Sequence, residues 1–258
     1  LMIKIPGYTI HSQLGVGGMA TVYRATQDSL RREVALKVVS KLEKLEPHFK
    51  KRFLHEGHDL ASLQHPNIAT IYDIAQTNSH SYYAMELLKG GSLSERMDKG
   101  VSLDEAFNII IQIGEALEYA HENHIIHRDL KPGNILFRDY STPILTDFGI
   151  ARIAEQKSEK GVWGTPSYMS PEQLKEEITT HQSDIFSLGC VMYELLTGQR
   201  AFSGENDFAI IYKITRENPV PVREIRPDLP EIFDKIMRKA LAKSLEERYS
   251  SCMDMAYD

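Results

Sequence analysis

The chain has 258 residues, of which 42% are hydrophobic and 26% are charged, and its formal net charge is -6. This is the composition of a globular protein with enough chain for one large domain or two small lobes. The acidic balance argues against nucleic acid or an anionic membrane as the main partner, because both select for a basic surface.

The two cysteines, Cys190 and Cys252, are too few for a disulfide framework, so we expect a reducing, cytoplasmic compartment. No apolar run reaches the ~18 residues that a membrane-spanning helix needs, and no signal-peptide pattern opens the chain. Leu1 precedes Met2, and residues 251–258 stop where a helix is starting. We therefore expect a fragment truncated at its C-terminus, and attachment to a membrane anchor elsewhere in the full-length protein stays open.

Residues 1–88 have a strand-rich pattern interrupted by one helix. The β-rich runs are separated by glycine or polar turns, which predicts a meander. The runs predicted as strands are 8–15, 21–26, 33–40, 68–76 and 82–87. The helix is expected over 46–64 and ends at His65-Pro66, because proline cannot continue the helical hydrogen bonds.

The pattern becomes helical after a glycine-rich connector at 88–91. Apolar residues recur at three- and four-residue spacing between Ala106 and Ala120, which predicts an amphipathic helix. The run 184–196 is apolar nearly all round, so we expect a helix buried on every side. Two further helices are expected, over 205–216 and 230–243.

This change of pattern indicates two structural parts. Residues 1–88 are expected to form a small antiparallel β-sheet lobe with one helix, and residues 89–258 a larger, mainly α-helical lobe. The predicted fold class is therefore α+β with two lobes.

Glycines are concentrated in the loop between the first two predicted strands. Gly15, Gly17 and Gly18 allow backbone amides to approach a phosphate chain that side chains would push away. A flexible hairpin turn accounts for the same residues. A dinucleotide-binding loop fits less well, because a helix must follow such a loop and here a second strand follows.

A lysine and a glutamate stand at positions that the pattern predicts to be buried. Lys37 shares a strand face with Ala35 and Val39, and Glu56 lies within an apolar stripe of the following helix. The other members of the stripe are Phe49, Phe53, Leu60 and Leu63. A buried carboxylate without a partner is strongly destabilising, so we expect Glu56 to pair with Lys37. Solvation of either side chain at the edge of its element is the alternative.

The densest chemical pattern lies between residues 127 and 149. It consists of His127-Arg128-Asp129-Leu130-Lys131-Pro132-Gly133-Asn134, followed by a strand pair and then Asp147-Phe148-Gly149. A base, two cations, an amide and a second aspartate suit phosphoryl transfer, which depends on positioning and charge neutralisation. An aspartate and an asparagine carbonyl are also the hard oxygen ligands that Mg²⁺ prefers.

In this order, and over nearly the whole chain, these segments resemble the eukaryotic-type (Hanks-type) serine/threonine protein kinase catalytic domain. Two stretches are similar to the bacterial members: Gly-Gly-Met-Ala-Thr-Val-Tyr at the glycine loop, and Lys-Pro-Gly-Asn within residues 127–134, which we call the catalytic segment. The resemblance implies transfer of the γ-phosphoryl group of Mg-bound ATP to Ser or Thr hydroxyls of proteins, including the kinase itself. It places ATP binding in residues 1–88, and catalysis, the activation segment and peptide binding in residues 89–258. Mn²⁺ is the alternative metal.

The resemblance also implies roles for single residues in and after the catalytic segment. Asp129 would accept the proton of the substrate hydroxyl, and Lys131 would steady the γ-phosphate. Asn134 and Asp147 would hold Mg²⁺. Thr165 would contact Asp129 and Lys131, and a lysine at position 131 is typical of serine/threonine rather than tyrosine kinases.

The same resemblance implies an ATP site in the first lobe. Lys37, locked by Glu56, would grip the α- and β-phosphates. The adenine pocket would be lined by Leu14, Val22, Ala35, Met85 and Leu136. The backbone at Glu86 and Leu88 would supply its polar contacts, and Ser92 would reach the ribose.

Regulation by phosphorylation is a further expectation from the resemblance. In the family, the arginine at the position of Arg128 often pairs with a phosphorylated residue of the activation segment, here 147–172. The candidate acceptors are Ser158 and Thr165, and autophosphorylation between copies would use a homodimer.

Two structural features are implied as well. Glu172 and Arg248 should form a buried ion pair, and Asp184 should cap its helix and bind the backbone of the catalytic segment.

The chain departs from the family pattern at Ala20, where many members have a third glycine, and at Ser170, where the motif usually has alanine. Neither change is expected to abolish activity.

Two competing interpretations stay open. A pseudokinase would keep the fold as a binding module, but it usually lacks one of the catalytic residues that are present here at positions 37, 129, 134 and 147. A small-molecule kinase would share the catalytic aspartate, but the peptide-docking segment 164–172 argues against it. A zinc site is not predicted, because His121, His124 and His127 lack the His-Glu-x-x-His spacing.

Overall fold

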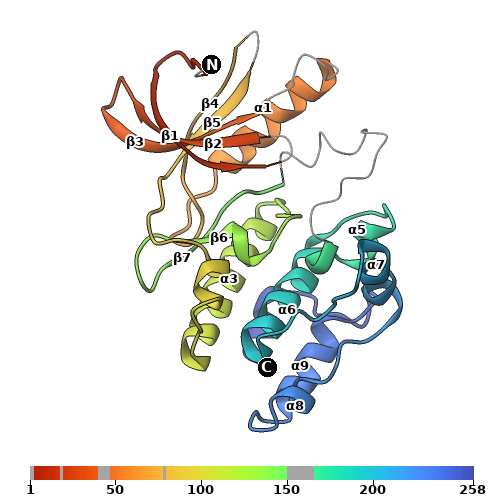
Figure 1. Ribbon diagram of the computed structural model, residues 1–258. Coiled ribbons are helices and arrows are strands. Elements are labelled where there is room, and N and C mark those ends of the chain that lie inside the picture. The colour runs from red at the N-terminus through yellow and green to blue at the C-terminus, as the bar shows by residue number, and fades with distance from the viewer. Residues whose placement is uncertain (1–2, 18–19, 40–46, 78–79, 150–165) are drawn as a thin grey trace. The chain divides into compact units, whose positions relative to one another are not determined.

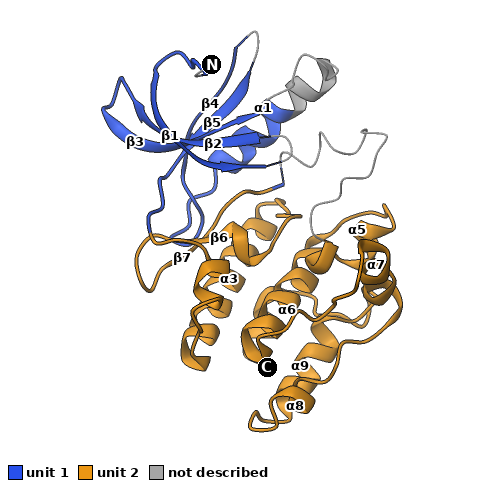
Figure 2. Cartoon of the chain, viewed as in Figure 1, with its two compact units in different colours: residues 1–89, 149–160 blue, residues 90–148, 161–258 orange. Residues whose placement is uncertain are grey.

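A computed structural model describes residues 3–17, 20–39, 47–77, 80–149 and 166–258, without the side chains of 47–52 (Figure 1). Contacts divide the chain into two compact units (Figure 2). Unit 1 comprises residues 1–89 and 149–160, and unit 2 comprises residues 90–148 and 161–258. Unit 1 is built on a β-sheet and unit 2 is mainly helical, so the predicted α+β class is confirmed.

The sheet of unit 1 has five strands in the order β1-β2-β3-β5-β4, and every neighbouring pair is antiparallel. The strands are β1 (Tyr8–Val16), β2 (Ala20–Gln27), β3 (Arg32–Val39), β4 (Ile71–Gln76) and β5 (Ser81–Met85). The strand predicted to begin at Ile68 begins later, because the Ile68 N–H donates to the His65 carbonyl at 3.1 Å and closes a turn.

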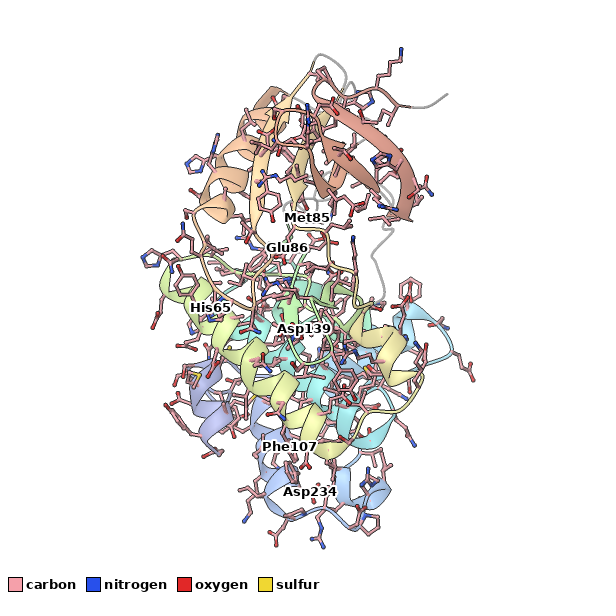
Figure 3. All side chains as sticks on the ribbon, turned by 90° about the vertical axis from the view of Figure 1, so that its left-hand side faces the viewer. His65, Met85, Glu86, Phe107, Asp139 and Asp234 are labelled. Atoms are coloured by element: carbon pink, nitrogen blue, oxygen red, sulfur yellow. The ribbon has the colours of Figure 1, made fainter. Side chains whose placement is uncertain are left out.

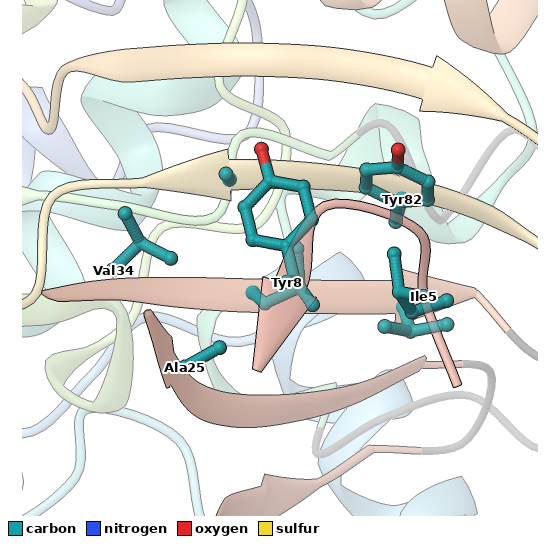
Figure 4. Packing of buried hydrophobic residues seen from close by; sticks show 8 residues of the cluster. Ile5, Tyr8, Ala25, Val34 and Tyr82 are labelled. Atoms are coloured by element: carbon teal, nitrogen blue, oxygen red, sulfur yellow. The ribbon is translucent and has the colours of Figure 1, made fainter. Parts of the chain in front are cut away.

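The two faces of β3 are both covered. Val34, Leu36 and Val38 are fully buried on one face, in a cluster that also contains Tyr8 and Tyr82 (Figure 4). The rings of these tyrosines meet edge to face, with centroids 5.6 Å apart, which is a favourable arrangement of two aromatic quadrupoles. The alternation that the sequence predicted for this strand is therefore confirmed.

Helix α1 (Pro47–Ala61) packs on the opposite face of the sheet. Phe53 is 1% exposed, and its ring centroid lies 6.3 Å from that of Tyr83 in β5. A Cβ on Gly57 would lie 2.7 Å from the Cδ1 atom of Ile74 in β4, so glycine permits a close approach of helix and strand. The expected apolar stripe is confirmed at Phe53, Leu60 and Leu63, which are all buried. The side chain of Phe49 lies outside the described residues.

The connector between the two units needs glycine for a steric reason. Gly90 N–H donates to the Phe137 carbonyl, and Phe137 N–H donates to the Gly91 carbonyl, both at 2.9 Å. A Cβ on Gly90 would lie 2.6 Å from the Phe137 carbonyl oxygen and 2.7 Å from its Cβ, closer than real Cβ contacts. Gly91 has φ 76, a conformation that glycine adopts without strain.

Unit 2 is organised around a buried central helix. Its main helices are α3 (Leu103–Glu122), α6 (His181–Thr197), α7 (Asp207–Arg216), α9 (Ile232–Ala240) and α10 (Cys252–Tyr257). Helix α6 is buried along nearly its whole length, as predicted, and Gly198 ends it in a left-handed conformation. It begins at His181 with Thr180 as its N-cap, so the expectation that Asp184 caps this helix is wrong.

Shorter elements complete unit 2. The predicted strand pair is β6 (Ile135–Phe137) and β7 (Pro143–Leu145). The sequence did not predict α2 (Leu93–Met97), α5 (Pro171–Leu174), α8 (Val222–Ile225) or the single turns η2 (Pro132–Asn134) and η3 (Pro166–Tyr168). These elements are too short for hydrophobic periodicity to be visible. Within the described ranges, none of the helices combines the length and apolarity needed to cross a membrane.

A Gly90→Ala variant should be destabilised, because its methyl group would collide with the backbone of Phe137. We expect a loss of about 1–3 kcal/mol in the free energy of unfolding, measured by urea denaturation. Gly133→Ala is the matched control, since no atom lies within 4 Å of its added Cβ. Equal stability of the two variants would contradict the steric role of Gly90.

Candidate active site

Three polar side chains of the catalytic segment converge in unit 2. Lys131 Nζ donates to Asp129 Oδ2 at 2.8 Å, and Asn134 Nδ2 donates to the same oxygen at 2.9 Å. Asn134 Nδ2 also donates to the Asp129 carbonyl at 2.7 Å. Asn134 is 6% exposed, whereas the side chains of Asp129 and Lys131 are 28% and 36% exposed. The structure thus gives a fixed carboxylate beside an ammonium group, with partial access to solvent.

The His127 ring is neutral and binds two backbone groups, one on each side of the site. It is fully buried, and burial lowers its pKa below the ordinary value although nearby carboxylates, Asp184 foremost, work in the other direction. Its Nδ1 accepts from the Asp129 N–H at 3.2 Å, and its Nε2–H donates to the Thr146 carbonyl at 2.8 Å. One ring therefore ties the backbone of Asp129 to the strand end that precedes Asp147.

The backbone of the segment is also held by Asp184, from the first turn of α6. Its two carboxylate oxygens accept from the His127 N–H at 2.7 Å and the Arg128 N–H at 2.8 Å. His121 Nε2–H donates to it as well, at 2.8 Å. Burial alone would raise the pKa of Asp184, but these donors hold it below its ordinary value. The predicted contact of Asp184 with the catalytic backbone is confirmed.

Arg128 has an unusual backbone that is fixed from both sides. Its φ is 66, in the left-handed region that costs most residues about 1–3 kcal/mol. Asp184 binds its N–H, and Gln173 Nε2 donates to its carbonyl at 2.8 Å. Gln173 belongs to α5, so this hydrogen bond links the end of the activation segment to the catalytic segment.

Gln173 was not predicted as a functional residue, although its sequence neighbourhood carries a signal. Ser170 and Gln173 form a capping box, in which each side chain bonds the backbone of the other. The spacing Ser-x-x-Gln before a helix is the sequence signature of this motif. It orients the amide, because Oε1 accepts from the Ser170 N–H at 3.0 Å and Nε2 is left to reach Arg128.

The strand pair β6–β7 brings Asn134 close to Asp147. Ile135 pairs with Leu145, and the ladder continues where Thr146 N–H donates to the Asn134 carbonyl at 2.9 Å. Thr146 Oγ1 donates to the same carbonyl at 3.0 Å. Asp147 follows with φ 57, again in the left-handed region. Strain of this kind is common where a backbone must aim a functional side chain.

A divalent hard cation fits the donor set at Asn134 and Asp147. The Asn134 amide nitrogen is committed to Asp129, so its Oδ1 is the atom that it can offer to a cation. Asp147 contributes a carboxylate, and both Asp129 and Asp147 act electrostatically on the His127 ring. Amide and carboxylate oxygens are the protein ligands that Mg²⁺ accepts.

In unit 1, several predicted ATP-binding residues lie on one face of the sheet. Gly15 pairs with Val22, and Val22 pairs with Lys37, so the three form one row across β1, β2 and β3. Ala35 pairs with Met85 on an adjacent row of the same face. Figure 3 labels Met85 at the end of β5, with Glu86 following it.

Lys37 lies near an aromatic ring that helix α1 also contacts. Lys37 Nζ lies 5.8 Å from the centre of the Tyr83 ring, the same ring that Phe53 of α1 contacts. Both Lys37 and Glu56 are half-buried. Their pairing therefore remains a prediction, supported by the burial of the helix stripe next to Tyr83.

The other residues predicted to bind ATP or to be phosphorylated differ in exposure and in hydrogen bonding. Leu14 is 52% exposed, and Gly17 N–H closes the glycine loop by donating to the Ala20 carbonyl at 2.8 Å. Glu86 N–H donates to the Thr70 carbonyl at 2.9 Å, whereas Leu88 and Leu136 are half-buried. Ser92 is the N-cap of α2, where its side chain accepts from the Glu95 N–H. Gly18, Ser158 and Thr165 lie outside the described residues.

Glu172 and Arg248 form the buried ion pair that was expected. Arg248 donates through Nη1 to Oε1 at 2.8 Å and through Nη2 to Oε2 at 3.2 Å. Ser183 Oγ donates to the same carboxylate at 2.6 Å. Burial raises the pKa of Glu172, but the arginine and the serine outweigh it and hold the pKa below the ordinary value. This pair anchors α5, and with it Gln173, to the helical core.

Together, the fold and the site define the class of the protein. An antiparallel sheet with one helix, a helical second unit, and an Asp-Lys-Asn centre followed by Asp-Phe-Gly are the features of protein kinases. The protein kinase domain family model matches residues 8–257, so the chain belongs to this family.

The comparisons with curated proteins place it among bacterial serine/threonine kinases. The chain is 36% identical over 261 residues to serine/threonine-protein kinase PknB of Mycobacterium leprae, and 38% identical over 256 residues to PrkC of Bacillus subtilis. These matches cover 97% of this chain but only 42% and 40% of the two relatives, so the chain spans about two fifths of their length.

Solved structures of bacterial kinase domains have the same fold. The PknI kinase domain of Mycobacterium tuberculosis matches with a TM-score of 0.79 and 26% identity, covering 99% of this chain and 95% of that one. Its C20A mutant gives a TM-score of 0.80 at 25% identity. The chain is thus a bacterial-type serine/threonine protein kinase catalytic domain.

Acid should weaken the Glu172–Arg248 pair. Because the pKa of Glu172 in the folded protein is below its ordinary 4.5, the contribution of the pair is complete above that pH and is lost as the pH falls through the lower value. We expect Glu172→Gln to unfold about 3–5 kcal/mol more easily at neutral pH and to show a smaller loss of stability in acid than the wild type. Urea denaturation between neutral and acidic pH measures both effects. Glu247→Gln, at an exposed position, serves as control, and a wild-type acid profile in Glu172→Gln would contradict this account.

Loss of the Gln173 amide should slow turnover without weakening ATP binding. Gln173→Met keeps the length of the side chain but cannot donate to the Arg128 carbonyl. One hydrogen bond contributes about 0.5–1.5 kcal/mol, so kcat should fall by up to about tenfold while KM for ATP changes little. Steady-state kinetics separates the two constants, with Gln199→Met as an exposed control. A rise in KM for ATP at unchanged kcat would rule out this positioning role.

Proposed function

We propose that this domain transfers the γ-phosphoryl group of ATP to serine and threonine hydroxyls of proteins, with residues 127–149 as its catalytic centre. The geometry of Asp129 carries the proposal. Its carboxylate is held by Lys131 at 2.8 Å and Asn134 at 2.9 Å, so it is oriented before any substrate arrives. An oriented carboxylate suits acceptance of a proton from an alcohol, and the ammonium group beside it suits the negative charge of a phosphoryl group.

Asn134 and Asp147 are the residues that we propose as ligands of Mg²⁺, with Mn²⁺ as a substitute. The family uses ATP together with a divalent metal, and these two side chains supply hard oxygen donors. When bound, the metal would neutralise charge on the nucleotide phosphates. Thr146 supports the proposal, because its two hydrogen bonds to the Asn134 carbonyl keep the two ligands at neighbouring positions.

Nucleotide binding is assigned to the sheet of unit 1, within the predicted lobe 1–88. Gly15, Gly17 and Gly18 would cover the phosphates with backbone amides, and Lys37, supported by Glu56, would neutralise them. The common face of Val22, Ala35 and Met85 supports an apolar adenine site. Leu14 and Leu136 complete that proposed site. The backbone of Glu86 and Leu88 would bind the adenine edge, and Ser92 the ribose.

The protein substrate and the regulation of the domain are proposed from family membership. Thr165 would contact Asp129 and Lys131 and favour serine or threonine acceptors. Ser158 and Thr165 are the proposed phosphorylation sites, modified between two copies of the chain in a homodimer. Cys190 and Cys252 are both free and buried, which is compatible with a cytoplasmic domain.

The reaction can be tested with labelled ATP, Mg²⁺ and a generic basic protein. Asp129→Asn should lower kcat by at least about 100-fold, because the base is lost, while nucleotide binding persists. Asp228→Asn changes an exposed aspartate and should leave the rate unchanged. ATP binding without phosphoryl transfer in the wild type would indicate a pseudokinase. Transfer only to small alcohols or aminoglycosides would indicate a small-molecule kinase.

A further inference from the structure

A group of side chains that carry possible metal-ligand atoms lies outside the catalytic segment, where α3 meets α10. Glu118 and His121 stand three residues apart near the end of α3, and Cys252 is the first residue of α10. One ligand atom from each of the three lies within 4.8 Å of the others. The Cys252 N–H also donates to Glu118 Oε2 at 2.8 Å, which fixes the start of α10 against α3.

His121 has an unsatisfied nitrogen at this place. Its side chain is only 7% exposed, and its Nδ1 is buried without a hydrogen-bond partner among the described residues. Such a group is destabilising unless it is bound to something. In a neutral ring whose Nε2–H donates to Asp184 at 2.8 Å, Nδ1 carries the lone pair and is the atom that His121 can offer to a ligand.

The arrangement of His121 and Asp184 matches the environment of a metal-binding histidine. A histidine that binds a metal usually donates its other N–H to a carboxylate, which fixes the tautomer and orients the ring. Here Asp184, which is 1% exposed, is the carboxylate that accepts from His121 Nε2–H.

The charges in the cluster also favour a cation. Two carboxylates lie at the cluster: Glu118 Oε2 accepts from the Cys252 N–H at 2.8 Å, and Asp184 Oδ2 accepts from His121 Nε2–H at 2.8 Å. A divalent cation bound here would offset the negative charge of these two carboxylates.

We propose that Glu118, His121 and Cys252 form a binding site for Zn²⁺ or a similar borderline-soft divalent cation. The ligands would be a carboxylate oxygen, His121 Nδ1 and the Cys252 thiolate, with water in the fourth tetrahedral position. A sulfur and an imidazole ligand select such a metal over Mg²⁺ or Ca²⁺, which take oxygen ligands.

The site is connected to the catalytic segment. The carboxylate that binds His121 also binds the backbone N–H groups of His127 and Arg128. A metal at His121 Nδ1 makes Nε2–H a stronger donor to Asp184, so metal binding stabilises α10, α3 and the support of the catalytic segment together. The histidine pattern 121, 124 and 127, from which no zinc site was predicted, is a different set, because His127 is occupied by Asp129 and Thr146.

The experiment uses Co²⁺ as a spectroscopic probe for Zn²⁺, with the reduced, chelator-treated protein in excess Mg²⁺ so that hard oxygen sites are filled. The wild type should bind one Co²⁺ per chain with a thiolate-to-cobalt charge-transfer band, and Zn²⁺ should displace it and raise the melting temperature. Cys252→Ser should lose the band, and Glu118→Gln should weaken Co²⁺ binding by at least about tenfold. Cys190→Ser is the matched control, because the chain has only these two cysteines and both are buried, and it should bind as the wild type does.

Circular dichroism of each metal-free variant establishes that it is folded, and if Cys252→Ser is unfolded, Glu118→Gln carries the comparison alone. The proposal is overturned if the folded wild type shows no thiolate band with Co²⁺. It is equally overturned if Glu118→Gln binds Co²⁺ as tightly as the wild type, or if the band depends on Cys190. None of these outcomes depends on kinase activity.

Discussion

The geometry of the catalytic segment depends on the hydrogen bonds that it donates to the buried carboxylate of Asp184. Asp184 is 1% exposed, and removing an ion from water is unfavourable unless hydrogen bonds replace the lost hydration. Here His121 and the backbone N–H groups of His127 and Arg128 do so, at 2.7–2.8 Å. The backbone donors can satisfy the carboxylate only if the catalytic segment keeps one conformation. The central helix α6 thus specifies the geometry of a loop that has little regular structure.

A second buried charge extends this control to the activation segment. Glu172 is neutralised by Arg248, from a distant part of the sequence, and the pair anchors α5 in the helical core. Gln173 then carries the restraint to the Arg128 carbonyl. Arg128, whose backbone is left-handed, is therefore held by Asp184 at its N–H and by Gln173 at its carbonyl. Two ion-based anchors and one amide thus hold the backbone that carries Asp129, Lys131 and Asn134, together with the packing of the buried Leu130 and of His127 against Phe148.

Much of the fold could be predicted from periodicity alone. The alternation in β3 and the apolar spacing of α3 each describe a face that must be buried, and the structure buries those faces. Boundaries were less predictable, because they depend on single hydrogen bonds such as the turn between His65 and Ile68 that delays β4. The expectation that Asp184 caps its helix was wrong for a similar reason: the residue lies in the first turn and its carboxylate is used by another segment.

The sequence by itself determined the family, and it predicted the catalytic residues in their order, because phosphoryl transfer requires particular groups at short spacings within continuous segments. Only the tertiary structure decided which distant groups support them. The pairing of Glu172 with Arg248, the contact of Gln173 with Arg128 and the approach of Cys252 to Glu118 and His121 join residues far apart in the chain. No local pattern encodes such contacts, since they arise from the packing of the helices of unit 2, with α10 on α3 and α3 on α6.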